Sequence, residues 1–525
     1  MGGVRTALYN YLYAKQHGGD FILRIEDTDS NRFVPGAEQY IIEALNWCGI
    51  IPDEGVDAEG HIVEEVSERH PHAPYRQSQR RGIYRKYAEQ LVASGHAYYA
   101  FDSAEDLDLM RSRAENAGST FIYNFSTRDK MNNSLTLSAE ETARMLEERN
   151  DWTIRFKMPE NRIVKMDDLI RGHIEVNSST LDDKVLWKKA DELPTYHLAN
   201  IVDDHLMEIT EVIRGEEWLP SLPLHWLLYE AFGWTDTMPR FAHLPLLLKP
   251  VGNGKLSKRD GDKMGFPVFP LEWTSPDGEK SRGYREDGYF PEAFVNMLAM
   301  LGWNPGTEQE IFSMQQLIEA FSLEKVGKSG AKFNPEKARW YNREYLRMRS
   351  DSELADLFMP ILEDKGVKAE PLYVEKVIGL VKERATFVAD FWAIASCLFV
   401  APEDFARYGI KAGEAFEKPA GPGRPADPRA KVYDDAATAP FVAKDVDKFW
   451  KKEFSDAARE ALENCEPEGI EEYIRSKGLP LGKVMNCLRL ALTGAASGLG
   501  IADIVSFIGK EEALNRMDFA VKRLG

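Results

Sequence analysis

The sequence is poor in cysteine and has no long apolar run. Only Cys48, Cys397, Cys465 and Cys487 occur among 525 residues, and no two are spaced as C-x-x-C. This pattern supports neither a disulfide framework nor a cysteine zinc site. No apolar stretch approaches the roughly 20 residues that a membrane-spanning helix needs, and the amino end does not resemble a secretory signal. These absences predict a cytoplasmic protein with no membrane association.

Positive charge is also in deficit. The 66 Lys and Arg residues against 85 Asp and Glu residues give a formal net charge of −19. This balance argues against coating of nucleic acid by the whole surface. It does not exclude a local basic patch that docks on one defined RNA, because binding depends on the face that is presented. The length predicts about three or four domains of roughly 100 to 200 residues each.

The most informative stretch is basic. Lys255–Asp262 follows a Gly-Asn-Gly turn at residues 252–254, and three cations, Lys255, Lys258 and Arg259, fall within five residues. A mobile cationic loop entered through glycines can close over a triphosphate and neutralise the charge that develops as pyrophosphate leaves. A solvated basic loop is the alternative, since short motifs recur by chance.

An acidic segment follows a short buried-strand pattern near the amino end. Residues 21–25 are apolar apart from Arg24, and they lead into Glu26-Asp27-Thr28-Asp29. Acidic groups at the carboxyl end of a strand in an open α/β sheet lie where ligands bind, and they can hold an ammonium group. A helix cap with a solvated turn is the alternative for the same residues.

Two further segments predict a polar pocket. Residues 193–204 suit a helix that presents Tyr196 and Asn200 on one face, four residues apart. Residues 209–218 suit a buried strand that ends in a cation, Arg214, and an aromatic residue, Trp218. Together these segments can form an amino-acid pocket beside an aromatic shelf for adenine. Ordinary core packing of the two aromatic residues is the alternative.

Two other patterns do not indicate ligand sites. Gly327-Lys328-Ser329 resembles the end of a P-loop, but Ser322 stands where that motif needs glycine and no strand leads into it. His197 and His205 have no third ligand at zinc spacing, so structural hydrogen bonds are the favoured interpretation. Neither pattern predicts a phosphate or metal site.

The chain pattern predicts an α/β amino-terminal part and an all-helical carboxyl part. Between about 97 and 195, short strands and charged helical segments indicate an inserted α+β module. The four prolines between 418 and 428 indicate a stiff exposed loop. Apolar residues recur at helical spacing in several windows, among them 2–17, 36–49, 83–94, 294–301, 314–321, 354–362, 374–389 and 457–464.

These segments, in this order, resemble the bacterial glutamyl-tRNA synthetases, a family of class I aminoacyl-tRNA synthetases. Residues 255–259 are similar to the KMSKS-type loop of the family, and residues 24–29 are similar to its RIEDTD stretch. The resemblance covers essentially the whole chain. It implies an α/β class, with a Rossmann-like catalytic domain that carries an α+β insertion and is followed by an all-α anticodon-binding region.

The resemblance also implies the domain order. The expected parts are the first half of the catalytic domain at 1–95, an acceptor-end-binding insertion at 96–195, the second half at 196–250, a stem-contact domain with the KMSKS-type loop at 251–343, and a helical anticodon-binding domain at 344–525. A helical carboxyl part differs from the β-barrels of glutaminyl relatives, and shorter tRNA-modifying paralogues lack it. Arg384 is a candidate reader of an anticodon base, because a guanidinium can hydrogen-bond to and stack on an unpaired base. A solvated helical arginine is the alternative.

Individual roles follow from the same resemblance. The implied catalytic residues are Lys255, Lys258 and Arg259. The implied ATP-binding residues are Lys258, Ser257 and Trp218. The implied glutamate-binding residues are Glu26, which would receive the α-ammonium group, and Tyr196, Asn200 and Arg214. A cationic Arg214 that faces a carboxylate would select the charged side chain of glutamate over the neutral side chain of glutamine.

The implied activity is that of a glutamate–tRNA ligase. The α-carboxylate of L-glutamate would attack the α-phosphorus of ATP, and the terminal ribose hydroxyl of tRNA(Glu) would then accept the glutamyl group. Neither step needs a protein nucleophile, so positioning and charge stabilisation, with Mg²⁺ on the ATP phosphates, would supply most of the rate. No zinc is expected, because residues 98–102 lack the thiols that some relatives carry there. A monomer is expected.

The amino end departs from the family pattern. The family begins with a strand and an HIGH-type motif whose histidines bind ATP, whereas Met1-Gly2-Gly3 falls where that motif should be finishing. A truncated or misassigned start is the favoured interpretation. The sequence as written is expected to bind tRNA and to form adenylate at a strongly reduced rate. The alternative functions are a non-catalytic tRNA-binding protein and a non-discriminating enzyme that also charges tRNA(Gln).

Overall fold

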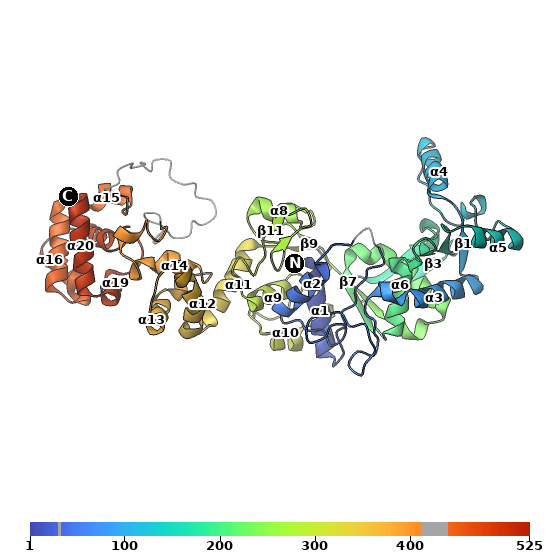
Figure 1. Ribbon diagram of the computed structural model, residues 1–525, viewed down its shortest axis with the longest axis horizontal. Coiled ribbons are helices and arrows are strands. Elements are labelled where there is room, and N and C mark those ends of the chain that lie inside the picture. The colour runs from blue at the N-terminus through green and yellow to red at the C-terminus, as the bar shows by residue number, and fades with distance from the viewer. Residues whose placement is uncertain (30–32, 411–438) are drawn as a thin grey trace. The chain divides into compact units, whose positions relative to one another are not determined.

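The computed structural model describes residues 1–29, 33–410 and 439–525. It divides into two compact units, the first comprising Met1–Asp287 and Pro291–Ala338, and the second comprising Gly288–Phe290 and Arg339–Gly525. In the described part of the chain every strand belongs to the first unit, and the second is helical (Figure 1). The expected change from an α/β part to an all-helical part is confirmed.

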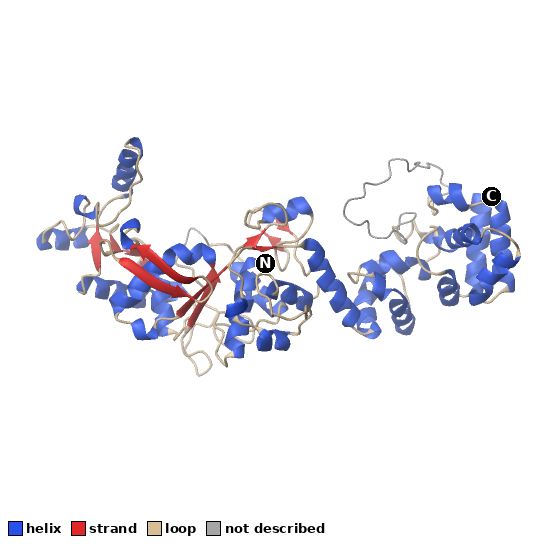
Figure 2. Ribbon diagram, turned by 180° about the vertical axis from the view of Figure 1, so that it is seen from behind, coloured by secondary structure: helices blue, strands red, loops and turns tan. Residues whose placement is uncertain are grey.

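One four-stranded sheet, in the order β4-β3-β8-β7, combines parallel and antiparallel pairs. Its strands are β3 (Ile163–Asp168), β4 (Gly172–Asn177), β7 (Glu211–Gly215) and β8 (Arg240–Leu244). Strands β7 and β8 pair in parallel along their whole length, and β3 joins β8 where Asp168 lies opposite Phe241. The antiparallel hairpin β3–β4 is the long pair of arrows in Figure 2. The carboxyl ends of β7 and β8 lie at one sheet edge, where open α/β sheets bind ligands.

A second sheet, in the order β1-β2-β5-β6, is antiparallel and lies between residues 97 and 194. Its strands are β1 (Ala97–Ala100), β2 (Thr153–Phe156), β5 (Val185–Lys188) and β6 (Leu193–Pro194). Helices α4 (Ala104–Asn116) and α5 (Ala139–Glu148) both begin with a serine capping box. The box satisfies backbone N–H groups that the first turn of a helix leaves without partners. Strands and capped helices together give the α+β texture expected for this segment.

One hydrophobic core joins both sheets to the helices that cover them. These helices are α3 (Arg81–Ala93), α6 (Tyr196–Leu206) and α7 (Leu222–Phe232). The core includes Tyr84 from α3, Leu198 from α6, Tyr229 from α7, Ile154 from β2 and Phe241 from β8, all fully buried or nearly so. The segment 96–195 therefore shares its core with the residues on either side of it, and its hairpin β3–β4 completes the sheet of β7 and β8.

The remaining elements are mostly helices. Those of the first unit are α1 (Gly2–Gln16), α2 (Ala37–Trp47), α8 (Lys258–Met264), α9 (Pro291–Ala299) and α10 (Met314–Ala320), with short strands β9 (Leu247–Leu248), β10 (Trp273–Thr274), β11 (Lys280–Ser281) and β12 (Ala331–Lys332). Helix α11 (Pro335–Met348) leads into the second unit, which contains α12 (Asp351–Asp364), α13 (Pro371–Val381), α14 (Asp390–Ala395), α15 (Ala443–Phe449), α16 (Lys452–Asn464), α17 (Ile470–Ser476), α18 (Leu481–Thr493), α19 (Ile501–Ile508) and α20 (Lys510–Leu524). Of the helices described, none is long and apolar enough to cross a membrane.

Two expected elements differ from the structure. Residues 21–25, expected to form a strand, make only isolated bridges, because Leu23 bonds to the carbonyl of Glu54 and Ile25 to that of Tyr75. Two separate irregular partners cannot form a continuous ladder. The helix expected over 374–389 ends at Val381, and a 3-10 turn follows it. The proline-rich segment 418–428 lies outside the described residues.

Candidate active site

A cavity of about 970 Å³ lies beside strand β7 in the first unit. Helix α1, the segment 19–26, helix α6 and strand β7 contribute to its wall. Five residues that the sequence singled out line it together, namely Glu26, Tyr196, Asn200, Arg214 and Trp218. The fold therefore brings the predicted pocket residues from three separate parts of the chain to one cavity.

Helix α6 sets the positions of Tyr196 and Asn200. They are four residues apart and so lie on one face of the helix, where the Asn200 Nδ2 donates to the Tyr196 hydroxyl at 3.1 Å. The Tyr196 ring packs on Trp218 with centroids 4.3 Å apart. Trp218 lies in the turn Glu216–Ser221 that follows β7 and is 37% exposed. Trp218 is therefore not a buried core residue, which was the alternative interpretation.

Arg214 is buried in the cavity wall and is held by neutral groups. Its Nε donates to His243 Nε2 at 3.0 Å, and its Nη1 donates to the Tyr196 hydroxyl and to His225 Nδ1, each at 3.2 Å. Its Nη2 lies 3.5 Å from the Trp218 carbonyl. Within the described residues Arg214 forms no salt bridge, although it is only 7% exposed. A buried cation without an opposite charge is costly, so this position favours an anionic ligand.

Around Glu26 the charge is the opposite. The Arg24 Nη2 donates to Glu26 Oε1 at 3.2 Å and to Asn200 Oδ1 at 2.7 Å, and it pairs with Asp204 at 3.0 Å. Burial alone would lower the pKa of Arg24, but the charges of Asp204, Glu26 and Asp203 raise it above its ordinary value. Burial raises the pKa of Asp204 to about 6 in spite of Arg24.

Asp203 is the third carboxylate of this group. It is fully buried and pairs with Arg80 at 2.8 Å. When all three carboxylates are ionised, they exceed the two arginines by one negative charge. Arg24, Asp204 and Glu26 all line the cavity, and Glu26, 38% exposed at its side chain against 6% for Asp204, is the carboxylate most accessible to a cation there. This end of the cavity therefore suits an ammonium group.

Part of the basic segment is helical, where a loop was expected. Ser257 begins helix α8 in a capping box with Asp260, so Lys258 and Arg259 lie in the first helical turn. The Lys255 Nζ pairs with Glu217 and the Lys258 Nζ pairs with Glu279, each at 3.0 Å. The capping box favours a helix start at this point, because Asp260 accepts from the backbone N–H of Ser257.

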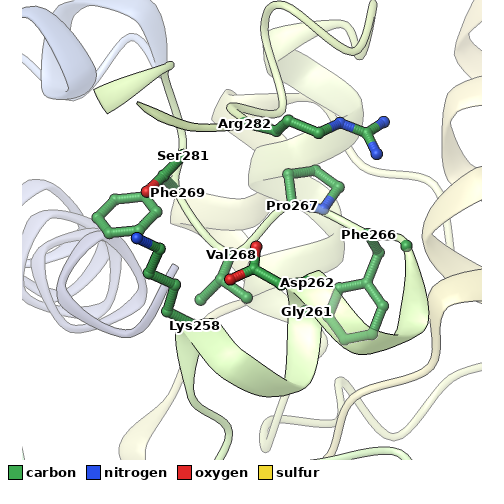
Figure 3. Close-up of a pocket in the computed structure, with 10 residues that line it drawn as sticks. Lys258, Gly261, Asp262, Phe266, Pro267, Val268, Phe269, Ser281 and Arg282 are labelled. Carbon is green, nitrogen blue, oxygen red and sulfur yellow. The ribbon is translucent and has the colours of Figure 1, made fainter. Parts of the chain in front are cut away.

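Lys258 and Glu26 line different cavities. Lys258 lines a smaller cavity of about 130 Å³, together with Asp262, Phe269 and Arg282 (Figure 3). Phe269 contributes to both cavities. The two sites adjoin through this ring, so the basic segment lies next to the pocket without sharing its cavity.

The other sequence-predicted residues are also located. Arg384 is exposed in the turn Lys382–Arg384 of the second unit, where its Nη1 lies 3.4 Å from the carbonyl of Gly498. His197 bonds to His225 at 3.0 Å, and His205 lies 3.1 Å from the Thr237 hydroxyl. Both histidines make hydrogen-bond contacts of the kind that was expected. Among residues 1–29, 33–410 and 439–525, no group of three or more His, Cys, Asp or Glu side chains is placed to hold a metal ion.

Several residues behind the predicted ones were not identified from the sequence. Among them are Arg24, which binds Glu26, His225 and His243, which bind Arg214, and Asp168, which binds His243. Arg24 carried a usable signal, since a charge within an apolar strand pattern needs a partner. Asp168 and His243 are brought together by the pairing of β3 with β8. Asp168 lies opposite Phe241, and His243 is two residues further along the same face of β8. The sequence does not display that pairing.

Comparison with known proteins gives consistent matches. Residues 1–340 match the family model described as tRNA synthetases class I (E and Q), catalytic domain, and residues 432–521 match an anticodon binding domain. The chain is 52% identical to a glutamate–tRNA ligase of Parabacteroides distasonis and 53% identical to one of Porphyromonas gingivalis, with 100% of this chain and 96% of each relative covered. It also matches a crystal structure of a glutamate tRNA ligase from Elizabethkingia meningosepticum in complex with its amino acid. That match has a TM-score of 0.87 and 47% identity, and it covers 100% of this chain and 97% of the other.

Proposed function

The chain belongs to the glutamate–tRNA ligases of the class I tRNA synthetase family, and on this premise we propose how its residues activate L-glutamate with ATP and load it onto tRNA(Glu). The observation that carries the proposal is Arg214, a buried guanidinium that lines the cavity without a salt bridge. The side-chain carboxylate of glutamate supplies the missing charge. Glutamine supplies none.

The hydrogen-bond polarity of the pocket supports the same preference. The Tyr196 hydroxyl oxygen accepts from both Arg214 Nη1 and Asn200 Nδ2, so its own proton is directed to another acceptor. Arg214 has only donors. A carboxylate accepts from both side chains, whereas the NH₂ group of a glutamine side chain would place a donor against donors.

The α-ammonium group of glutamate belongs at the opposite charge. Glu26 lines the same cavity, and Arg24 ties it to Asn200. The ammonium group compensates the excess negative charge around Arg24, while Arg214 takes the side-chain carboxylate. These two contacts leave the α-carboxylate as the free end of the substrate.

In the first step an oxygen of that α-carboxylate attacks the α-phosphorus of ATP, and the bond to the bridging oxygen of pyrophosphate breaks. Trp218 offers an exposed ring for the adenine beside the pocket. Lys255, Ser257, Lys258 and Arg259 neutralise the phosphate charge that develops. Because Lys255 and Lys258 pair with Glu217 and Glu279, the phosphates must replace these two carboxylates.

In the second step the terminal ribose hydroxyl of the tRNA attacks the carbonyl carbon of glutamyl-adenylate, and AMP leaves. No protein nucleophile is required in either step. Mg²⁺ bound to the ATP phosphates would neutralise part of their charge beside Lys255, Lys258 and Arg259. The proposed domain limits remain 1–95 and 196–250 for the catalytic halves, 96–195 for acceptor-end binding, 251–343 for stem contact and 344–525 for anticodon binding. Arg384 is proposed to read an anticodon base. The protein is proposed to be a cytoplasmic monomer.

Charging assays on tRNA(Glu) and tRNA(Gln) with labelled glutamate test this function. We expect glutamate-dependent and ATP-dependent charging of tRNA(Glu). The variant R214Q should lose it, and R85Q on α3 should keep it, because Arg85 is exposed, lies outside the cavity lining and pairs with Glu89 on the same helix. Charging with glutamine in place of glutamate, or equal activity of R214Q, would contradict the proposed pocket.

A further inference from the structure

Behind the cavity wall, Arg214 contacts two histidines that belong to two separate hydrogen-bonded branches. One branch runs from His243 to Asp168, and the other from His225 to His197. All four residues lie outside the cavity lining, and His225, His243 and Asp168 are buried. We propose that Asp168 and His243 are positioning residues that hold the Arg214 guanidinium as a carboxylate receptor. This inference rests on the proposed function.

The hydrogen bond from Arg214 determines which ring nitrogen of His243 carries the proton. A guanidinium has only N–H donors, so the 3.0 Å bond from Arg214 Nε requires that His243 Nε2 carries no proton. The remaining proton of the neutral ring is therefore on Nδ1, and it is donated to Asp168 Oδ2 at 2.6 Å. Burial lowers the pKa of His243 in spite of Asp168, which agrees with a neutral ring.

The backbone fixes the orientation of Asp168. Its Oδ1 accepts from the backbone N–H groups of Ile170, Arg171 and His243 at 2.9, 2.8 and 3.4 Å, which leaves Oδ2 for the ring of His243. Burial alone would raise the pKa of Asp168, but the bonds from His243 and these amides lower it below its ordinary value. The turn after β3 thus orients Asp168, Asp168 orients His243, and His243 orients Arg214.

The second branch has the same polarity. Arg214 Nη1 donates to His225 Nδ1, so His225 carries its proton on Nε2 and donates it to His197 Nδ1 at 3.0 Å. Burial lowers the pKa of His197 to about 4 and that of His225 well below its ordinary value. Both edges of the guanidinium therefore meet neutral acceptors. Nη2 is left with a single long protein contact and is the nitrogen most available to a ligand.

The alternative is that Asp168 and His243 only tie β3 to β8. Two substitutions of His243 separate these roles. Glutamine reaches as far as Nε2, so H243Q keeps an acceptor for Arg214 and loses the bond to Asp168. Asparagine reaches only as far as Nδ1, so H243N keeps the bond to Asp168 and loses the acceptor for Arg214. A positioning role predicts that H243N is the more damaging change, and a structural tie predicts the reverse.

The variant D168N tests the direction of the hydrogen bonds from Arg214 through His243 to residue 168, with almost no change in side-chain shape. Its amide oxygen keeps the three backbone N–H groups, so its NH₂ group must face His243 Nδ1. The ring then carries its proton on Nε2, directly against the Arg214 Nε–H group. Asp167 provides a matched control on the same hairpin, because it forms an exposed pair with His173 at 2.9 Å. D167N alters that pair and leaves Arg214 untouched.

The experiment is calorimetric titration of the full chain with L-glutamate and L-glutamine, with melting curves for every variant. We expect D168N to lose about ten- to a hundredfold in glutamate affinity, and H243N to bind glutamate about tenfold more weakly than H243Q. Glutamine affinity should change much less, and D167N should match the wild type. Wild-type glutamate affinity in D168N, equal losses for both amino acids, or weaker binding by H243Q than by H243N would overturn the positioning role.

A wild-type chain that binds no glutamate and variants that do not fold each call for a second measurement. If the wild-type chain binds no glutamate, the proposed pocket fails, and the positioning role is judged by the histidine tautomers alone. Nitrogen-15 labelling of the wild-type histidines reads these tautomers by NMR without any variant, and it also decides the case in which variants do not fold. We expect an Nδ1–H form for His243 and an Nε2–H form for His225. The opposite tautomer at His243 would overturn the inference.

Discussion

Lys255 and Glu217 form an ion pair with 3.0 Å between Nζ and Oε1, and Glu217 directly precedes Trp218 at the cavity. Burial alone would raise the pKa of Glu217, but a backbone hydrogen bond and Lys255 lower it, so the carboxylate is charged when the pair forms. Both side chains are about half exposed, at 60% and 46%. An exposed pair of this kind is worth little and is easily exchanged for a phosphate.

Removing the Glu217 carboxylate should therefore raise the affinity of the protein for ATP. In E217Q we expect ATP affinity to rise by up to about fivefold, because Lys255 no longer has to leave a partner. The free energy of unfolding should change by less than about 1 kcal/mol. Nucleotide titration and urea unfolding measure the two quantities. A large drop in ATP affinity would instead show that Glu217 takes part in nucleotide binding.

Replacing Arg214 should abolish stabilisation by glutamate. A ligand present at 100 times its dissociation constant adds about 2.7 kcal/mol to folding stability. We expect saturating glutamate to raise the melting temperature of the wild-type chain and to leave that of R214Q unchanged. R85Q serves as the exposed arginine control. A glutamate-induced shift in R214Q as large as in the wild type would contradict the role of this cation.

Asp204 should leave a signature in the pH dependence of stability. Its pKa is raised by burial from 3.8 to about 6, so between these values the folded state binds more protons than the unfolded state. Stability from this group is therefore lost as pH rises from about 4 to 6 and regained on acidification. In D204N the pH dependence of unfolding over this window should differ from wild type by up to about 3 kcal/mol. The same comparison on D108N, an exposed aspartate on α4, should show no such difference.

Trp218 should contribute to nucleotide affinity by stacking. Base–aromatic stacking is worth about 1–3 kcal/mol, so W218A should bind ATP at least about fivefold more weakly than the wild type. W218F should fall between the two, because it keeps a smaller ring. Glutamate affinity should stay within about threefold in W218F, where an aromatic partner for Tyr196 is retained. Equal ATP affinity in all three chains would remove Trp218 from the adenine site.

Helices were predicted well where apolar residues repeat at helical spacing. Windows such as 2–17 and 354–362 coincide with α1 and α12, because each of these helices buries one face. The buried strand predicted at 21–25 was wrong in form, since its partners are irregular segments whose pairing leaves no pattern in the sequence. The window 374–389 ran past the end of α13 because Asp390, which accepts the amide hydrogens of Thr386 and Phe387, starts a new turn there.

The candidate site was predictable in its parts and not in its connections. Glu26, Tyr196, Asn200, Arg214 and Trp218 were found from local patterns, and they share one cavity. The separation of Lys258 into an adjoining cavity depends on how Phe269 packs, which no local pattern records. The bond between Asp168 and His243 joins residues 75 positions apart in the chain. Such contacts follow from sheet pairing, so only the folded structure reveals them.

The hairpin β3–β4 ties residues 96–195 to the sheet that β7 and β8 form. Asp168 ends β3 where it joins β8, and the hydrophobic core continues from β2 through α6 and α7 to β8 without a boundary. Residues 96–195 therefore share a sheet and a hydrophobic core with the residues on either side of them. Exchanging residues 96–195 for a foreign module would remove Asp168, which supports His243 behind Arg214, while altering none of the residues that line the cavity.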